Sequence, residues 1–307
     1  MTKLSPLASV SETRAVLEAH GLSTKYSLGQ NFLINDAILQ KIVALADLAP
    51  DDYVLEVGPG IGTLTIALLK NAGRVLSVER DPDLPAVLAE TLAPWSDRFS
   101  LISKDALDLT MDDLREAGTP SGALPDKFVA NLPYAVAATV VLDYFEQFAS
   151  LDSATVMVQK EVADRMAAVP GTKNYGAYTV KLRLHAEPAG RFGVGPGNFF
   201  PPPRVESAVL RLDRRPVFDD DGVQLDADAI VAACTMAEAA FATRRKTLSN
   251  SCKTYFAGRG PQGAAVIAAL PQLFERAGVD PRLRGETLDL PAFVRLGRAY
   301  QQLGAPA

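Results

Sequence analysis

Four consecutive residues, Asn131-Leu132-Pro133-Tyr134, carry the most specific chemical signal in the sequence. The side-chain carbonyl of Asn131 and a backbone carbonyl near Leu132 can accept hydrogen bonds from one exocyclic amino group. Pro133 stiffens the turn and brings no N–H group that would compete. Tyr134 offers an aromatic face for stacking an extruded base. Alone, the pattern would favour a β-turn with a packed tyrosine. Its position after a predicted strand favours a site that aims the lone pair of adenine N6 at an electrophile.

A proline-rich stretch, Asn198–Ser207, contains a second candidate for base contact. Its consecutive prolines predict a stiff, extended segment. We expect Phe199 to form the other face of a base sandwich with Tyr134, and Phe200 is the less favoured choice. Burial in the core is the alternative for either ring. Because stacking uses the ring face, we expect the hydroxyl of Tyr134 to be dispensable.

The segment Glu56–Gly62 places a glycine-rich turn between a predicted strand and a predicted helix. Glycines such as Gly58 and Gly60 let the backbone turn tightly and approach a ligand closely. The glycines are spaced two apart with Pro59 between, whereas the dinucleotide fingerprint has the spacing G-x-G-x-x-G. The arrangement resembles the first motif of S-adenosyl-L-methionine-dependent methyltransferases. A purely structural turn is the alternative interpretation.

Two acidic residues follow the next two predicted strands. Glu79 ends the second strand and can accept hydrogen bonds from ribose hydroxyls, as in doubly wound nucleotide-binding folds. Asp105 follows the third strand and is placed to accept from an adenine amino group. Because ligands of open α/β sheets bind at the carboxyl ends of strands, we expect both residues to join the glycine-rich turn in one site. A capping or buried-edge role is the alternative for Glu79.

Strands and helices alternate along most of the chain. Apolar segments predict strands at 53–57, 74–79, 99–102, 127–130 and 154–158, and helices are predicted at 12–19, 36–46 and 63–69. This alternation predicts an α/β fold with a mostly parallel, Rossmann-like sheet. Alternating runs at 180–187 and 205–212 predict further strands, and His185 falls in the first of these. The acidic segment 215–228 is predicted to be a linker, after which the spacing is helical with breaks near 260 and 271. We therefore predict a catalytic domain over 1–215 and a smaller helical domain over 216–307.

Charge is distributed unevenly, although the net charge is -5. Residues 154–215 carry 10 basic and 5 acidic side chains, and residues 241–259 carry basic side chains without an acidic one. Such a distribution is a candidate phosphate-binding surface, and a solvated helix face is the equally weighted alternative. We expect the RNA-contacting residues to be Arg244, Arg245 and Lys246.

Several function classes find little support in the composition. The chain has 2 cysteines and 2 histidines, without ligand spacing, so we expect no metal site and no disulfide. No long uncharged apolar stretch predicts a membrane span, and the first residues do not resemble a secretory signal. We expect a cytoplasmic protein.

The ordered set of motifs resembles the small-subunit rRNA adenine N6,N6-dimethyltransferase family across nearly the whole chain. The matching pieces are Gly29–Leu33, Glu56–Gly62, Glu79, Asp105, Asn131–Tyr134, Gln159–Val162, Tyr175-Gly176, Phe200–Ser207, Arg244–Thr247 and Arg284–Leu288. The resemblance implies an S-adenosyl-L-methionine site formed by Gln30, Asn31, Leu33, Gly58, Gly60, Glu79, Asp105 and Asn131. It also implies two adjacent adenosines of 16S rRNA, in a hairpin near its 3′ end, as targets. We expect the partner to be an immature 30S subunit and the protein to be a monomer.

Two positions depart from the family pattern, and three rival functions remain. Lys104 replaces a glycine and Ala135 replaces an asparagine, which leaves the details of the adenine pocket and the target loop open. The rivals are a resistance-type 23S rRNA adenine dimethylase, a DNA adenine methylase and a non-catalytic assembly factor. Arg244–Lys246 and Arg284–Leu288 argue against the first, the lack of a sequence-reading module against the second, and the intact Asn131–Tyr134 motif against the third.

Overall fold

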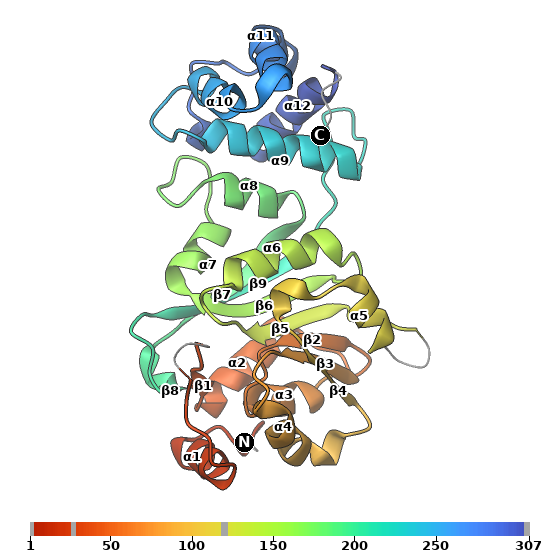
Figure 1. Cartoon of the computed structure of the whole chain (residues 1–307), viewed down its shortest axis with the longest axis vertical. Coiled ribbons are helices and arrows are strands. Elements are labelled where there is room, and N and C mark those ends of the chain that lie inside the picture. Colours follow the sequence, from red (N-terminus) through yellow and green to blue (C-terminus); the bar gives the residue numbers. More distant parts are fainter. Residues whose placement is uncertain (1–2, 26–28, 118–121, 304–307) are drawn as a thin grey trace. The chain divides into compact units, whose positions relative to one another are not determined.

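The computed structural model describes residues 3–25, 29–117 and 122–303 of the 307-residue chain. Contacts divide the chain into two compact units. The first consists of Met1–Ala163 and Pro188–Arg214, and the second of Asp164–Glu187 and Arg215–Ala307. Figure 1 shows the strands of the central sheet in the first unit and the helices α9 to α12 in the second.

The first unit is built on a seven-stranded sheet with the order β4-β3-β2-β5-β6-β9-β7. Its strands are β2 (Tyr53–Val57), β3 (Arg74–Glu79), β4 (Phe99–Ser103), β5 (Lys127–Asn131), β6 (Ser153–Gln159), β7 (Ala186–Val194) and β9 (Ser207–Arg214). Strands β2 to β6 pair in parallel, and β9 pairs antiparallel to β6. The chain runs outward from β2 to β4 and then returns to β5 on the other side of β2. Such a reversal opens a crevice at the carboxyl ends of the strands, where ligands of open sheets bind.

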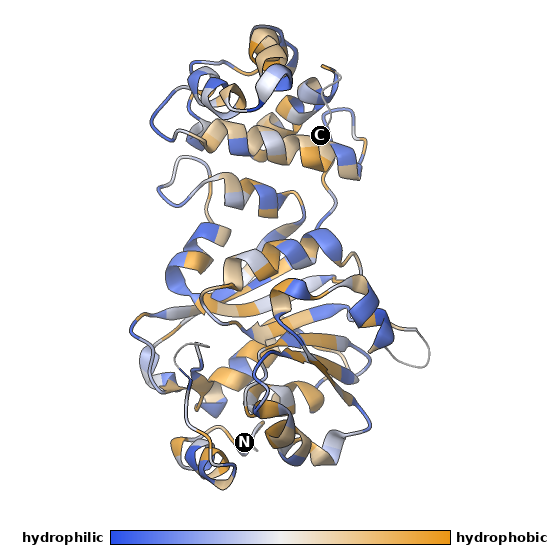
Figure 2. Ribbon diagram, viewed as in Figure 1, coloured by the Kyte–Doolittle hydropathy of each residue, from blue (hydrophilic) through white to orange (hydrophobic). Residues whose placement is uncertain are grey.

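Helices cover both faces of this sheet. The helices of this part are α1 (Val10–Ala19), α2 (Asp36–Ala46), α3 (Thr63–Leu69), α4 (Leu84–Thr91), α5 (Met111–Glu116), α6 (Ala137–Gln147) and α7 (Lys160–Met166), with short 3-10 turns at Ala93–Trp95, Ala106–Asp108 and Pro196–Asn198. Val54, Val75 and Val129 pack against α2, α3 and α4 in one core. On the other face Phe128 of β5 meets Tyr144 of α6, with ring centroids 5.1 Å apart. Figure 2 shows the strands as mainly hydrophobic, as expected for a sheet buried on both faces.

A two-stranded sheet joins distant parts of the first unit. Strand β1 (Phe32–Leu33) pairs antiparallel with β8 (Phe199–Phe200), in a register that opposes Phe32 to Phe200 and Leu33 to Phe199. The pairing connects the segment before α2 to the proline-rich stretch before β9. Residues from both segments, among them Phe32, Leu33 and Pro201, line the same cavity.

The second unit is helical. It contains α8 (Ala177–Arg183), α9 (Ala227–Phe241), α10 (Leu248–Ala257), α11 (Gly260–Ala277), α12 (Leu290–Gln301) and a 3-10 turn at Gly285–Thr287. Met236, Phe256 and Phe293 belong to its core. A Cβ atom at Gly297 of α12 would lie 2.7 Å from the backbone nitrogen of Ala233, so α9 and α12 pack at a distance that only glycine permits.

The structure confirms the α/β class and the parallel sheet and corrects three details. The predicted strand at 180–187 is wrong in its first half, because 177–183 form α8 and β7 begins at Ala186; His185 lies in the turn between them. Pro271 lies inside α11 and does not break it. The predicted boundary at 215 differs from the division into units, because segment 164–187 packs with the helical unit: the Tyr175 hydroxyl donates to the Leu288 carbonyl at 2.8 Å.

A search of the described residues for a helix with the length and apolar character needed to cross a bilayer finds none.

Candidate active site

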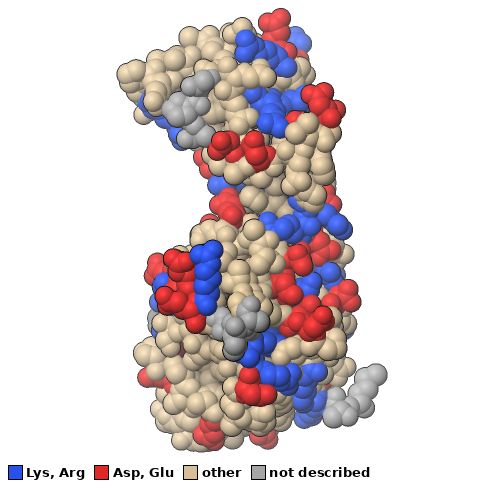
Figure 3. Space-filling model, turned by 90° about the vertical axis from the view of Figure 1, so that its right-hand side faces the viewer, with Lys and Arg blue, Asp and Glu red and all other residues tan. Residues whose placement is uncertain are grey.

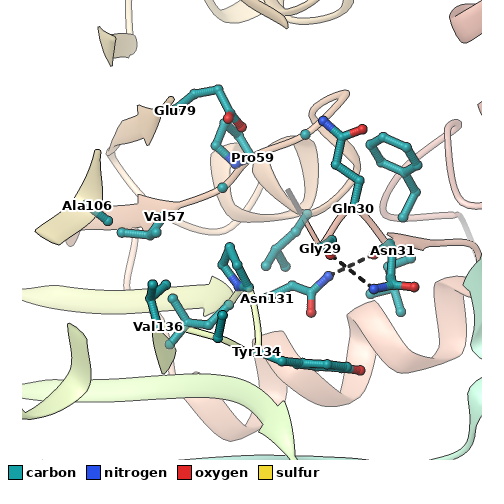
Figure 4. A pocket seen from close by; sticks show the side chains of 18 of the residues that line it. Gly29, Gln30, Asn31, Val57, Pro59, Glu79, Ala106, Asn131, Tyr134 and Val136 are labelled. Atoms are coloured by element: carbon teal, nitrogen blue, oxygen red, sulfur yellow. Dashed lines mark hydrogen bonds between the residues drawn. The ribbon is translucent and has the colours of Figure 1, made fainter. Parts of the chain in front are cut away.

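A cavity of about 720 Å³ opens at the carboxyl ends of the parallel strands. Eleven of the predicted cofactor-binding and catalytic residues line it: Gln30, Asn31, Leu33, Gly58, Gly60, Glu79, Asp105, Asn131, Leu132, Pro133 and Tyr134. Figure 4 shows Glu79 and Pro59 on one side of the cavity and Asn131 and Tyr134 on the other. The fold thus gathers residues from five separate parts of the sequence at the switch point of the sheet.

The glycine-rich turn forms the floor beside β2. Gly60 adopts a φ of +59°, which L side chains rarely adopt, and a Cβ atom there would lie 3.0 Å from Cε1 of Phe32. Gly62, with a φ of +90°, is the N-cap of α3. The turn therefore brings bare backbone to the cavity at the N-terminus of a helix, where unpaired N–H groups are available.

Glu79 stands at the end of β3 with 8% of its surface exposed. Its Oε1 accepts a hydrogen bond from the backbone N–H of Asp81 at 2.9 Å. Burial raises the pKa of this carboxyl, and backbone N–H groups of Asp81 and Gly60 oppose that shift. The carboxylate is therefore held in place by the backbone and faces the cavity.

Glu56, the first residue of the segment Glu56–Gly62, is buried beneath the cavity with 1% exposed. Its Oε2 accepts from the hydroxyls of Thr65 at 2.7 Å and Ser77 at 2.8 Å. Burial raises its pKa from 4.5 to about 7, the two hydroxyls lower it, and the charge of Glu79 raises it. The floor of the site thus contains a carboxyl in addition to Glu79, and burial raises its pKa to about 7.

The N-terminal segment is fixed to the end of β3 by a polar cluster. Gln30 donates from Nε2 to Oδ2 of Asp81 at 2.7 Å, and Lys25 Nζ lies 2.5 Å from carboxylate oxygens of both Asp81 and Asp83. Burial acts to raise the pKa of Asp81, but the hydrogen bonds from Lys25, Asp83 and Gln30 lower it overall. Gln30 therefore stabilises the cavity wall in this structure through its hydrogen bond to Asp81.

Asp105 is held on two sides. One oxygen accepts from the Leu107 backbone N–H at 3.1 Å, and the other lies 2.9 Å from Nη1 of Arg80. Arg80 lines the cavity and was not predicted. The departure at Lys104 is accommodated, because its ammonium pairs with Asp113 at 2.7 Å.

The motif Asn131–Tyr134 leaves β5 and forms the opposite wall. Asn131 donates from Nδ2 to the Asn31 carbonyl at 3.2 Å, which fixes the orientation of its carboxamide (Figure 4). Leu132 donates its backbone N–H to Met157 of β6 at 3.0 Å. The Tyr134 hydroxyl lies 2.6 Å from the Ser207 hydroxyl, and burial raises the pKa of the phenol. The wall presents an oriented amide and an anchored aromatic ring.

Phe199 does not line the cavity, which corrects its predicted role. Its side chain is 2% exposed and belongs to the core under α2 and α3. Side chains alternate along a strand, so β8 turns Phe199 inward and Phe200 outward. Phe200 lies under the guanidinium of Arg14, 5.0 Å from the ring centroid. In place of Phe199, the wall includes Pro201–Val205 and Gln159. The stiff proline segment was predicted from the sequence, whereas no pattern singled out Gln159 beyond its place in the family resemblance.

The predicted RNA-contacting residues lie in the second unit, between α9 and α10, and all three are exposed. Arg244 is engaged with Glu286 at 3.4 Å and with the Lys173 carbonyl. The side chains of Arg245 and Lys246 have no partner among the hydrogen bonds and ion pairs of the described part of the chain, and the Lys246 backbone N–H donates to the Thr243 carbonyl at 3.1 Å. Figure 3 shows basic and acidic side chains interspersed over one face of the molecule. Phosphate contacts would therefore depend on small groups of basic residues and not on one large basic surface.

Metal ligation has no candidate within residues 3–25, 29–117 and 122–303, where no group of three or more His, Cys, Asp and Glu side chains could hold an ion.

Residues 21–268 match the model of the family described as ribosomal RNA adenine dimethylase. The chain belongs to this family. It is 40% identical to ribosomal RNA small subunit methyltransferase A of Corynebacterium diphtheriae, over 94% of this chain and 93% of the relative. The enzyme of the same name from Geobacillus kaustophilus is 39% identical over 97% and 98% of the two chains. Family membership confirms the resemblance and the prediction of an rRNA adenine methyltransferase.

Two solved structures of methyltransferases share the fold. A dimethyladenosine transferase from Plasmodium falciparum matches with a TM-score of 0.72 and 22% identity, covering 89% of this chain and 98% of that one. The 23S rRNA methyltransferase ErmE matches with a TM-score of 0.61 and 26% identity, covering 89% of this chain and 100% of that one. These matches confirm the Rossmann-like methyltransferase fold.

Proposed function

We propose that this member of the family transfers methyl groups from S-adenosyl-L-methionine to N6 of two adjacent adenosines. The targets are in a hairpin near the 3′ end of 16S rRNA, in an immature 30S subunit, and the protein acts as a monomer without a metal. One observation carries the proposal: Glu79 on one side and Asn131 with Tyr134 on the other line a single cavity. That arrangement supplies separate positions for a ribose and for a target base.

The residues of the β2–β4 side fit S-adenosyl-L-methionine. This cofactor supplies a methyl group on a cationic sulfonium and carries two ribose hydroxyls and an adenine. Glu79 would accept from the ribose hydroxyls, and Asp105 from the adenine amino group. The bare backbone of Gly58 and Gly60 leaves room for the amino-acid part, which Asn31 and Leu33 would enclose. A Cβ atom at Gly60 would crowd the Phe32 ring, so packing in the cavity wall also favours glycine at this position.

Asn131 would act on the nucleophile. Its Nδ2 is engaged with the Asn31 carbonyl, so its Oδ1 is the atom free to accept from the target amino group. With a backbone carbonyl near Leu132, it would direct the N6 lone pair along the line of transfer and stabilise the positive charge that develops on N6. Tyr134 would stack on the base. The same groups would serve the second methylation of each base.

RNA contact by the second unit is a separate part of the proposal. Arg245 and Lys246 would neutralise phosphates, and Arg244 would do so from a position already fixed by Glu286. Alanine at Arg245 or Lys246 should each reduce the salt slope of binding to 30S particles by roughly one unit. The exposed Arg276 on α11 offers a matched control. Unaltered slopes in both variants would show that the cluster is only a solvated surface.

The central experiment measures methyl transfer from labelled S-adenosyl-L-methionine to undermethylated 30S subunits, with 50S subunits in parallel. We expect two N6-dimethylated adenosines in 16S rRNA and none in 23S rRNA. The identity of 39–40% to relatives named for the small subunit, against 26% to ErmE, supports this choice over the activity named for ErmE. Label only in 23S rRNA would favour the resistance-type function, and binding without transfer would favour an assembly factor.

A further inference from the structure

Ser207 contacts the catalytic wall without lining the cavity. It is the first residue of β9, and its side chain is 1% exposed. Its hydroxyl lies 2.6 Å from the hydroxyl of Tyr134, a short distance for two neutral oxygens. The contact joins Tyr134, in the motif after β5, to the first residue of β9, which lies much later in the chain.

The position of Ser207 is determined by the sheet. Strand β9 pairs antiparallel with β6 over the whole of β6, and Ser207 opposes Gln159 in this register. Gln159 lines the cavity, so the pair marks the point where the sheet reaches the site. A serine has one side-chain torsion angle, and here its backbone is held by a paired strand. The hydroxyl is therefore a fixed point next to the cavity.

The Tyr134 side chain requires a contact that restricts its rotation. Tyr134 lies in the turn between β5 and α6, after Pro133, and its side chain is only half buried. A ring that stacks on a base must keep its place, and a half-buried ring can swing about its first side-chain torsion angle. The phenol oxygen lies on the axis of the second torsion angle, so a hydrogen bond to it restricts the first torsion angle and thereby the position of the ring.

We propose that Ser207 is a positioning residue for methyl transfer, which fixes the position of the Tyr134 ring through the bond between the two hydroxyls. The inference rests on the proposed function and replaces the expectation from stacking that the hydroxyl of Tyr134 is dispensable. The bond also links the wall segment Pro201–Val205, which ends two positions before Ser207, to the Asn131–Tyr134 motif that would hold the base.

A double-mutant cycle tests the proposal. Single-turnover rates are measured at saturating undermethylated 30S subunits for wild type, Ser207→Ala, Tyr134→Phe and the double variant. Each single substitution should slow transfer roughly threefold to tenfold, as expected for one lost neutral hydrogen bond, with unchanged affinity for S-adenosyl-L-methionine. The double variant should be no slower than either single variant. Ser207→Ala slowing the reaction equally in the Tyr134→Phe background would overturn the proposal, because the serine would then act through packing alone.

The buried Ser153 at the other end of β6 is the matched control, and Ser153→Ala should leave the rate unchanged. A second measurement is independent of turnover. In protein with ¹³C-labelled tyrosine, Ser207→Ala should shift the Tyr134 ring signals, and Ser153→Ala should not. Unshifted Tyr134 signals would overturn the positioning role, whereas a wild-type protein that fails to methylate 30S subunits would overturn the proposed function and leave this signal to decide on the contact.

Discussion

The two sides of the cavity differ in charge and in the way they are held. The side formed by β2, β3 and β4 carries three carboxyls, Glu56, Glu79 and Asp105, whose oxygens are engaged by hydroxyls, backbone N–H groups or Arg80. Along the side formed from β5 onward, no described lining residue is acidic, and the polar side chains there are those of Asn131, Tyr134, Gln159 and Arg204.

This difference matches the two ligands that the proposed reaction requires. A cationic methyl donor with ribose hydroxyls is favoured next to acceptors and negative charge, whereas a neutral adenine needs oriented acceptors and a ring. A carboxylate beside N6 would also hold the charged product amine and oppose loss of its proton. Substitutions on the side that carries the carboxyls should therefore change cofactor affinity or stability, and substitutions of Asn131 and Tyr134 on the opposite side should change turnover.

The largest effect is expected at Asn131. Asn131→Ala removes the acceptor that strengthens as charge develops on N6, and only interactions stronger in the transition state speed the reaction. The single-turnover rate should fall by about 10²–10³, the effect of one preorganised polar group. Calorimetry should show nearly unchanged affinity for S-adenosyl-L-methionine.

Asn71 provides the control for this prediction. It is part-buried and donates from Nδ2 to the Ala67 carbonyl at 2.8 Å, away from the cavity lining. Asn71→Ala should leave the rate of transfer unaltered. A loss of cofactor affinity in Asn131→Ala that equals its loss of rate would remove the distinction between the two sides.

Glu56 should make stability depend on pH. Its pKa is raised from 4.5 to about 7 by burial, so the folded state binds this proton more tightly than the unfolded state. Its favourable contribution is complete below about pH 4.5 and is lost as the pH rises through about 7. Glu56→Gln should therefore gain stability relative to wild type between pH 5 and 8, by roughly 3 kcal/mol at most.

Urea unfolding at pH 5 and pH 8 measures this difference. The glutamine retains an oxygen that can accept from Thr65 and Ser77, so the hydroxyl network can persist in the variant. A parallel pH dependence in both proteins would show that Glu56 keeps its charge when folded.

Glu79 should have an intermediate effect, confined to binding. Glu79→Ala removes charged hydrogen bonds to the ribose and should weaken S-adenosyl-L-methionine binding by about 1–3 kcal/mol. Calorimetry on the folded variant gives the value. Unchanged affinity would place the ribose elsewhere in the cavity.

Arg80 should have the smallest effect. Its ion pair with Asp105 has side chains 52% and 32% exposed, and exposed pairs contribute about 0–1 kcal/mol. Arg80→Ala should change cofactor affinity less than Asp105→Ala does in the same titration. The opposite order would make the arginine, and not the carboxylate, the group that contacts the cofactor.

Local patterns predicted most of the first unit. The strands Tyr53–Val57 and Arg74–Glu79 and the helix Asp36–Ala46 have the predicted bounds, because continuous apolar runs and helical spacing reflect burial directly. Segment 180–183 was predicted as part of a strand but belongs to the helix α8. Its alternating residues fit either period over such a short length, and packing on α9 decides the outcome.

The site could be predicted where a turn follows a strand, and less well where contacts join distant segments. Asn131, Glu79 and the glycine-rich turn each follow a strand, so topology alone brings them together. The ion pair of Arg80, the brace from Gln30 to Asp81 and the bond from Ser207 to Tyr134 depend on side-chain geometry. The burial of Phe199 follows from the register of β1 with β8, which the sequence does not encode locally.

The pairing of Phe32 with Phe200 has a consequence for the order in which the protein forms. The glycine-rich turn and the motif after β5 are synthesised first, but the wall at Pro201–Val205 is translated after both. Non-local pairings of this kind form slowly, because the chain must close a long loop before the contact is gained. A nascent chain that ends before Pro201–Val205 therefore lacks this wall of the cavity. The ability to enclose a nucleotide arises late in synthesis.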